Sequence, residues 1–577
     1  MYLFHLFRSF LPLHNPIGFG GSDFVEFGLV LILVGLVFAR AWCVLAAVRL
    51  ARRPIWCMLF LCALVIVLRV GLLPLQPVPT PAGSDDFSYV LLGDTLAHFR
   101  LANPTHPMHR FFETTFALQE PSYSSIYALG PGLALALGEL LFGLPWAGVL
   151  LSMGVLCALC YWALRGWTSS GWALVGGLLA VCEFGPLNAW MNRYWGGAVS
   201  GIAGCLVFGA LPRIRERWQT RDAVLLGIGV GLQMITRPFE SLFLDLSIIL
   251  FFLPELRRQE WSRLFKIARP ALLAFLPAAA LLLLHNHAVT GNWTTLPYAL
   301  SRYQYGVPTT FTFQPNAVPH NTLTEAQQLY YAGQARVHGE ETETLGTYFD
   351  RLGSRAGFYR FFFLAPLCVA LLFFLPLLRE YRYLWIVLTF LLFALGTNVY
   401  PYFFVHYLAA ETCLFLLVAI LGLQRLSEWQ LGDWRGGSFA AAGILFLCAA
   451  HFLFWYFVHA QGDEQILWSM TAFETAPGIN FGDVEGRIAV EKRLQAEPGR
   501  QLVFVRYFPT HGYLEWIHND ADIDQARVVW ALELNPDDNA KLKALYPDRK
   551  VWLMEPDAQP PKLVPYPVSA GPFLPVE

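Results

Sequence analysis

Twelve apolar runs dominate the chain and restrict what it can fold into. They lie at about 27–48, 55–74, 146–164, 172–190, 197–212, 222–236, 239–254, 269–286, 358–378, 384–404, 407–424 and 438–459. Each approaches the roughly 20 residues that a helix needs to cross a hydrocarbon core. With 56% hydrophobic and only 14% charged residues, the 577-residue chain is predicted to be an α-helical polytopic membrane protein with about twelve transmembrane helices.

Net charge and cysteine placement argue against a nucleic-acid-binding protein and against a disulfide-stabilised extracellular fold. The formal net charge of −2 predicts no nucleic-acid partner, because binding to the phosphate backbone needs a basic surface. All ten cysteines fall within apolar runs, so no disulfide framework is expected outside the membrane.

Basic clusters orient the predicted helices. They follow the first, fifth, seventh, ninth and eleventh runs, at 49–53, 213–221, 257–269, 379–382 and 425–435. Because cytoplasmic loops carry an excess of Lys and Arg, odd-numbered helices are predicted to end inside. The N-terminus, the loops 75–124 and 287–357 and the C-terminal tail are then expected outside. The assignment requires that a further, glycine-broken run at 125–142 is interfacial or half-inserted.

The composition changes after residue 459. Residues 1–459 are predicted to form the transmembrane domain with its external loops, and residues 460–577 a small soluble extracytoplasmic α/β domain. Period-two strands at 501–508, 527–532 and 550–554 alternate with helical patterns at 483–496 and 536–545, which predicts a short parallel sheet.

This tail shows no motif for a nucleotide or a metal. It lacks a glycine-rich phosphate loop, so no nucleotide site is expected. Asp520, Asp522 and Asp524 are interpreted as a solvated acidic turn, because the glycine and the distal glutamate of an EF-hand are missing.

The polar stretch 83–127 carries acids, bases and aromatics beside the predicted membrane. It opens with Asp85 and Asp86 and later contains His109 and Arg110. Such groups at a membrane surface are suited to chemistry on a lipid-linked substrate. The aspartates could instead form a solvated turn or an N-cap for a helix from residue 87, and the two basic residues could simply anchor the interface.

Further unusual residues fall on the same predicted face. They are Arg193, Tyr194, Trp195, Arg237, Glu240 and His406. Both arginines are candidate phosphate ligands, because a guanidinium binds phosphate bidentately. Arg237 could instead pair with Glu240. The two aromatic residues could stack on sugar or prenyl units or belong to an interface belt, and His406 could be a packed or snorkelling residue.

The order of these elements resembles the GT-C superfamily of polytopic glycosyltransferases, which includes protein O-mannosyltransferases and the lipid A aminoarabinose transferase. The resemblance covers roughly residues 55–430. It is carried by the segments Asp85-Asp86-Phe87-Ser88-Tyr89, Pro121-Ser122-Tyr123, Gly143-Leu144-Pro145-Trp146, Phe184-Gly185-Pro186 and Asn192-Arg193-Tyr194-Trp195-Gly196-Gly197. Some branches of the superfamily place a metal-binding acid where this chain has the last of these segments. The resemblance therefore implies no cofactor firmly and leaves a divalent metal in doubt.

The resemblance implies a membrane glycosyltransferase. It would transfer a sugar from a polyprenyl-phosphate-linked donor to a glycan, lipid or protein acceptor on the extracytoplasmic side of a bacterial inner membrane. Asp85 or Asp86 would act as the general base, and Arg237 or Arg193 would hold the leaving phosphate. Two other classes stay open: a transporter or flippase of lipid-linked sugars, although no repeat of paired broken helices is visible, and a non-catalytic envelope receptor.

Overall fold

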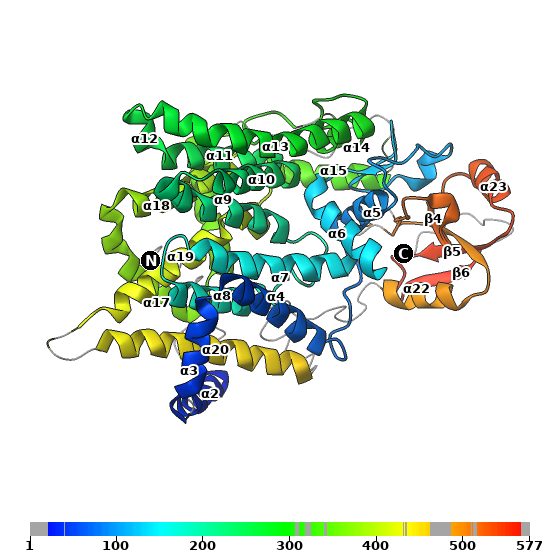
Figure 1. Cartoon of the computed structure of the whole chain (residues 1–577). Coiled ribbons are helices and arrows are strands. Elements are labelled where there is room, and N and C mark those ends of the chain that lie inside the picture. The colour runs from blue at the N-terminus through cyan, green and yellow to red at the C-terminus, as the bar shows by residue number, and fades with distance from the viewer. Residues whose placement is uncertain are drawn as a thin grey trace. The chain divides into compact units, whose positions relative to one another are not determined.

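The computed structural model describes residues 21–566 apart from 40, 306–310, 317, 319–322, 324, 340–342, 431, 433–435, 462–485, 509–510 and 512–515. The chain divides into two compact units, whose elements are labelled in Figure 1. Unit 1 comprises residues 1–79, 146–282 and 343–479, and unit 2 comprises residues 80–145, 283–342 and 480–577.

Unit 1 is a bundle of apolar helices. Those lying wholly or mainly in it are α2 (Gly21–Ala39), α3 (Ala41–Ala51), α4 (Pro54–Gly71), α7 (Pro145–Leu164), α8 (Ser170–Phe184), α9 (Ala198–Arg217), α10 (Thr220–Thr236), α11 (Pro238–Phe251), α12 (Leu253–Arg257), α13 (Trp261–Thr290), α16 (Leu345–Arg355), α17 (Cys368–Phe374), α18 (Tyr381–Thr397), α19 (Thr412–Ser427) and α20 (Gly436–Gln461). Short 3-10 helices are η2 (Ala356–Phe362), η3 (Ala365–Leu367), η4 (Leu375–Arg379) and η5 (Val405–Glu411). Small residues let these elements approach closely: a Cβ on Gly204 of α9 would lie 1.8 Å from the carbonyl oxygen of Ala410 in η5.

The chain is an integral membrane protein. In the part of the chain that the structure describes, six helical segments are long and apolar enough to cross a membrane by length and composition: Pro54–Gly71, Pro145–Leu164, Ala198–Arg217, Trp261–Thr290, Val405–Ser427 and Gly436–Ala460. Shorter apolar helices lie at Phe27–Val37, Leu129–Phe142, Ser170–Phe184 and Tyr381–Thr397. A total of about twelve spans stays a prediction.

The run predicted at 358–378 is not one straight helix. The segments Leu345–Phe362 and Ala365–Arg379 meet at a bend of 108° and count together as a seventh possible span. Pro366 and Pro376 explain the short 3-10 elements here, because proline lacks the N–H that continues an α-helix.

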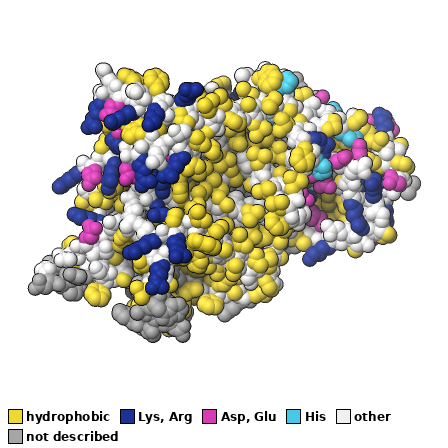
Figure 2. All heavy atoms as spheres, in the orientation of Figure 1, with side chains coloured by type: hydrophobic (Ala, Val, Ile, Leu, Met, Phe, Trp, Pro, Cys, Tyr) yellow, Lys and Arg dark blue, Asp and Glu magenta, His cyan; other side chains and the backbone are white. Residues whose placement is uncertain are grey.

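Basic side chains gather at one end of unit 1. On the face drawn in Figure 2, Lys and Arg lie over the end that holds α12 and α18, and hydrophobic side chains cover the helices beside it. On α13, Phe265, Leu272 and Leu273 are 70%, 57% and 59% exposed, as lipid-facing residues would be. The gathering of basic residues at one end is what the predicted orientation requires, while the side of the membrane stays a prediction.

Unit 2 contains the polar stretch that follows residue 80. Its first helix, α5 (Ser84–Ala97), packs on α6 (Leu129–Phe142). Between them in the sequence come η1 (His109–Phe112) and the hairpin of β1 (Ala117–Leu118) with β2 (Ser124–Ser125), and α14 (Pro297–Tyr305) and α15 (Glu325–His338) follow later. Pro131 lies in the first turn of α6, where no intrahelical donor is needed, so α6 is a continuous helix of 14 residues. That it does not cross the membrane stays a prediction.

The C-terminal part of unit 2 forms the predicted parallel sheet. Its strands are ordered β4 (Val528–Leu532), β3 (Arg500–Val505), β5 (Arg549–Glu555) and β6 (Lys562–Pro565). The first three are parallel, with Leu502 opposite Val529 and Val551, and β6 is an antiparallel edge strand that the sequence did not predict. The helices α22 (Arg487–Ala496) and α23 (Pro536–Leu545) and the short η6 (Ile523–Gln525) complete it.

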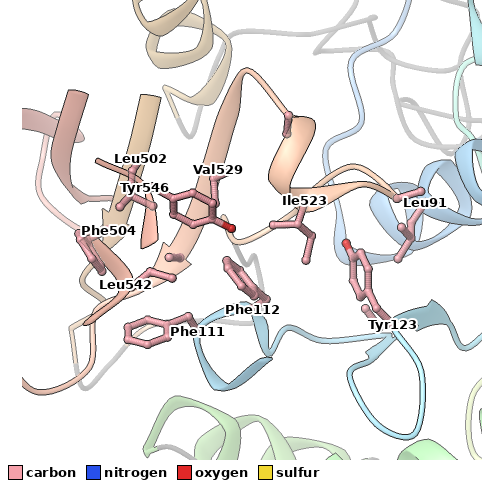
Figure 3. Close-up of a cluster of buried hydrophobic side chains, with 14 of the residues drawn as sticks. Leu91, Phe111, Phe112, Tyr123, Leu502, Phe504, Ile523, Val529, Leu542 and Tyr546 are labelled. Atoms are coloured by element: carbon pink, nitrogen blue, oxygen red, sulfur yellow. The ribbon is translucent and has the colours of Figure 1, made fainter. Parts of the chain in front are cut away.

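The polar stretch and the C-terminal sheet share one hydrophobic core (Figure 3). Phe111, Phe112 and Tyr123 pack with sheet and loop residues that include Phe504 and Ile523, and each of these five is at most 5% exposed. The tail therefore does not bury its apolar surface alone. The stretch that carries the candidate catalytic acids supplies one side of the core.

Candidate functional site

Asp85 and Asp86 lie in the first turn of α5. The N-cap of this helix is Gly83, so the alternative that an aspartate caps a helix starting at residue 87 is wrong. Acidic groups in a first turn are favourable because they face the positive end of the helix dipole. Asp86 is 2% exposed, and its Oδ2 accepts a hydrogen bond from the backbone N–H of Ala82 at 3.3 Å. Asp85 is half-buried.

Tyr127 orients the Asp85 carboxylate. Its hydroxyl donates a hydrogen bond to Oδ1 of Asp85, and its ring stacks on Tyr89 with centroids 4.2 Å apart. Burial and, after it, the charge of Asp85 raise the pKa of Tyr127 well above its ordinary value. The phenol thus remains a donor at neutral pH. A carboxylate held in one orientation is suited to accept the proton of a substrate hydroxyl.

His109 and Arg110 lie in η1 and contact acids nearby in the sequence. Nη1 of Arg110 is 2.9 Å from Oε1 of Glu113, and Nε2 of His109 is 3.9 Å from Oε1 of Glu120. Burial raises the pKa of Glu113 while Arg110 acts in the opposite sense. Contact of His109 or Arg110 with a substrate stays a prediction.

Within unit 1, candidates from three separate segments form one cluster. The guanidinium carbon of Arg193 is 5.4 Å from the Trp195 ring centre, and Trp195 meets His406 edge-on at 5.0 Å. His406 is followed in η5 by Tyr407, and the guanidinium of Arg237 lies over the Tyr407 ring at 4.6 Å. We call Arg193, Trp195, Arg237, Glu240, His406 and Tyr407 the arginine–aromatic cluster.

Arg237 occupies the junction of α10 and α11. Its φ of −145° and ψ of 83° interrupt the helix, because the following Pro238 disfavours helical geometry at the preceding residue. Its Nη1 is 3.1 Å from Oε1 of Glu240, so the predicted alternative of an ion pair is present. A guanidinium carries five N–H donors, so this pair and a phosphate contact are compatible.

A buried arginine that sequence reasoning missed holds the 192–197 segment. Arg69 of α4 is 0% exposed and donates from Nε to Oδ1 of Asn192 at 3.0 Å. It also stacks on Trp146 at 4.7 Å. A lone arginine inside an apolar run was the available signal. Tyr194 in the same segment is 6% exposed and donates to the carbonyl of Pro79 at 2.8 Å, and its stacking on a substrate stays a prediction.

Two further missed arginines hold the segment that leads into η5. Arg355 donates to the carbonyls of Thr397, Tyr400 and Pro401 at 3.0, 2.7 and 3.1 Å. One turn earlier on α16, Arg351 donates to the carbonyl of Asn398 at 2.9 Å. Because carbonyls at a helix C-terminus lack intrahelical partners, the end of α18 is a natural acceptor for them. These contacts fix the start of the segment that carries His406 and Tyr407.

The acidic turn of the tail has structural partners. Oδ1 of Asp524 accepts a hydrogen bond from the Tyr546 hydroxyl at 2.5 Å and lies 3.3 Å from Nε2 of His106, while 57% of its side chain is exposed. In the part of the chain that the structure describes, no three His, Cys, Asp or Glu side chains group closely enough to hold a metal ion.

Comparison with solved structures finds similar membrane proteins. ArnT from Cupriavidus metallidurans in the apo state matches with a TM-score of 0.50 and 12% identity, over 87% of this chain and 92% of that chain. ArnT from the same organism bound to undecaprenyl phosphate gives 0.49 and 12%, over 90% and 93%. The archaeal oligosaccharyltransferase AglB from Archaeoglobus fulgidus, in complex with an inhibitory peptide and a dolichol-phosphate, gives 0.38 and 11%, over 86% and 69%. No protein-family model and no curated protein matches the sequence.

The similarity to apo ArnT spans most of both chains, and at this identity it shows the fold. ArnT is an aminoarabinose transferase of the GT-C superfamily. The GT-C-like fold predicted from the sequence segments is therefore confirmed.

Proposed function

We propose that the protein is a membrane glycosyltransferase. It transfers a sugar from a polyprenyl-phosphate-linked donor to an acceptor hydroxyl on the extracytoplasmic side of a bacterial inner membrane. The observation that carries the proposal is the arginine–aromatic cluster in a chain with a GT-C-like fold. Cationic, aromatic and imidazole groups gathered at helix ends match the phosphate and sugar of such a donor.

The reaction exchanges one C–O bond for another. The acceptor oxygen attacks the anomeric carbon of the donor sugar, and the bond from that carbon to the phosphate oxygen breaks. Its electron pair stays on the polyprenyl phosphate, and the hydroxyl proton passes to a carboxylate. Asp85 or Asp86 is proposed as that base.

The arginine–aromatic cluster is proposed to act on the donor. Arg237 and Arg193 hold the phosphate, whose charge grows as the C–O bond breaks. Trp195 stacks on the sugar or the first prenyl unit, and His406 supports it from the ring edge. Glu240 keeps Arg237 in place through the ion pair.

Transfer by the purified full chain tests the proposal. The protein in lipid nanodiscs is incubated with polyprenyl-phospho-hexoses and -pentoses and an extract of envelope glycans and lipids. Mass spectrometry then follows release of the free polyprenyl phosphate and the appearance of glycosylated product. A nanodisc has no closed compartment, so a flippase or a receptor yields neither, whereas the proposed enzyme yields both. Absence of product with every donor would overturn the proposal.

A further inference from the structure

A cleft of about 600 Å³ opens within unit 2. Most of its lining residues come from α5, α22 and the segment 518–530. The positions that α22 contributes follow helical spacing and form one face of that helix; they are Arg487, Glu491, Leu494 and Gln495. The volume lies inside the roughly 300–1,000 Å³ that small-ligand sites occupy. The activity proposed above leaves this cleft without a role.

A rigid stack joins the walls of the cleft. The Phe87 ring lies between His518, at 3.8 Å and nearly parallel, and the guanidinium of Arg487 at 4.2 Å. Arg487 also donates to Oε1 of Glu491 at 2.9 Å and to the carbonyl of Trp516 at 3.2 Å. A cleft built in this way is preorganised, so a ligand need not order its walls.

The cleft is unsuited to an extended peptide. β4 is an edge strand of the sheet and contributes Val528 and Trp530 to the lining. Peptides commonly add to such an edge through its backbone groups. Here the Asn519 side chain accepts from the N–H of Trp530 at 2.9 Å and donates to its carbonyl at 2.8 Å. One side-chain amide therefore occupies the position of an added strand.

The lining favours a polyhydroxylated ligand. Most lining residues carry hydroxyl, amide, imidazole, guanidinium or carboxylate groups. A lipid chain offers no hydrogen bonds in place of those of the water that it would displace from these polar groups, which costs free energy. A sugar hydroxyl can both donate and accept, so it suits a wall that mixes donors with acceptors. Five carboxylates face only two guanidinium groups, which disfavours an anionic ligand such as the donor phosphate.

We propose that this cleft is the acceptor-glycan site of the enzyme and binds two or three neutral or amine-bearing sugar residues of the acceptor. The role of the cleft as an acceptor site rests on the proposed glycosyl transfer. Sugar binding by the cleft does not depend on that transfer.

Binding is tested without catalysis. The full chain in nanodiscs is titrated with three β-1,4-linked disaccharides that differ in charge: neutral cellobiose, the diamine chitobiose and cellobiouronic acid. Saturation-transfer NMR reports contact, and competition reports affinity. The neutral sugar and the diamine are expected to bind, and the uronic acid at least tenfold more weakly. Failure of both favoured sugars, or tighter binding of the acid, would overturn the proposal.

Variants locate the binding. Gln525 and Gln495 are exposed residues of the lining, so Gln525→Trp and Gln495→Trp fill the cleft from its rim without touching the core. Lys492→Trp places the same side chain on an exposed position of α22 outside the lining and is the matched control. The two filling variants should lose sugar binding, and the control should keep it. Equal binding in all three proteins would overturn the assignment.

Kinetics separate this inference from the proposed function. In the transfer assay, Gln525→Trp should raise the acceptor KM at least tenfold and leave the donor KM unchanged. If no protein transfers sugar but the disaccharides bind in the cleft, the proposed function fails and the glycan site stands. If transfer proceeds and the filling variants keep a normal acceptor KM, the site fails and the enzyme stands.

Discussion

The guanidinium of Arg237 lies over the ring of Tyr407, with its central carbon 4.6 Å from the ring centre. The contact joins the α10–α11 junction to η5, two segments far apart in the sequence. A cation held against an aromatic face keeps its charge and its orientation. Loss of this cation should weaken donor binding, because the donor phosphate already carries its negative charge before the reaction begins.

Arg237→Ala should raise the apparent donor KM. Loss of a hydrogen bond to a charged group costs about 1.5–3 kcal/mol, which corresponds to roughly 10–100-fold in affinity. Arg263→Ala is the matched control, because Arg263 also pairs with a glutamate three residues away, Glu260, and lies near an aromatic ring, but its side chain is 63% exposed. The transfer assay with varied donor measures both. An unchanged donor KM in Arg237→Ala would remove the phosphate role.

Arg355 should matter because it holds in place the backbone that leads to the arginine–aromatic cluster, and not because its own charge binds the donor. Arg355→Ala removes three hydrogen bonds to the segment 397–401, and lysine cannot reach all three carbonyls from one point charge. We expect Arg355→Ala and Arg355→Lys both to lower the melting temperature and to raise the donor KM. The changes should be smaller in Arg355→Lys. Arg425, whose side chain is 55% exposed, provides the control variant Arg425→Ala. Normal stability and KM in Arg355→Ala would contradict this account.

Unit 2 should lose stability as the pH falls below about 6.5, the pKa of an unperturbed histidine. Nδ1 of His106 accepts the N–H of Met108 at 3.0 Å, so protonation of this nitrogen breaks a hydrogen bond. Burial lowers the pKa of His106, although Asp524 acts in the opposite sense. A histidine with a lowered folded-state pKa binds fewer protons when folded. The stability is therefore complete above the unfolded pKa of about 6.5 and is lost as the pH falls toward the folded value.

The melting temperature of the full chain, measured from pH 7.5 to 5.5, tests this expectation. His106→Gln should flatten the slope. The control is His98→Gln, because His98 also lies beside an aspartate, at 3.0 Å, but has a 56% exposed side chain. The same slope in His106→Gln and in the unmodified protein would contradict the assignment.

Local patterns predicted the strands β3, β4 and β5 to within a few residues, because short runs rich in β-branched and aromatic residues favour strands. Their burial does not alternate, since residues 502–505 of β3 are all buried. β6 was missed because it has four residues, ends at Pro565 and forms only by pairing with β5. The shared core of unit 2 could not be predicted either. Its segments meet only through folding, as Asp94 and the N–H of Ala521 do at 2.6 Å across 427 positions.

The candidate site, too, could be predicted from the sequence only in part. Arg237, His406 and Trp195 were recognisable because polar residues between apolar runs are costly unless they have a role. Their assembly into one cluster depends on how helix ends meet in unit 1. Arg355 was missed because it lies in a polar helix, where an arginine usually only contacts solvent.

The shared core should couple the tail to the polar stretch. Phe112 is 1% exposed and packs edge-on against His106, so Phe112→Ala should destabilise unit 2 by about 3–5 kcal/mol. Truncation after residue 461 exposes the same core and should make residues 80–145 sensitive to proteolysis. Phe439→Ala, at a 70% exposed position of α20, is the control. A truncated chain that stays stable, active and unchanged in acceptor choice would contradict the coupling.

An aspartate at the start of α5 is proposed to take the proton of the acceptor hydroxyl. The most direct test compares sugar transfer by the unmodified protein, Asp85→Asn, Asp86→Asn and the double variant, with Asp537→Asn at an exposed position of α23 as control. A general base acts in the transition state, so the double variant should fold, keep its donor KM and lose roughly 10²–10⁴-fold in kcat. The single variants identify which carboxylate is the base. Full turnover by the folded double variant would contradict the account.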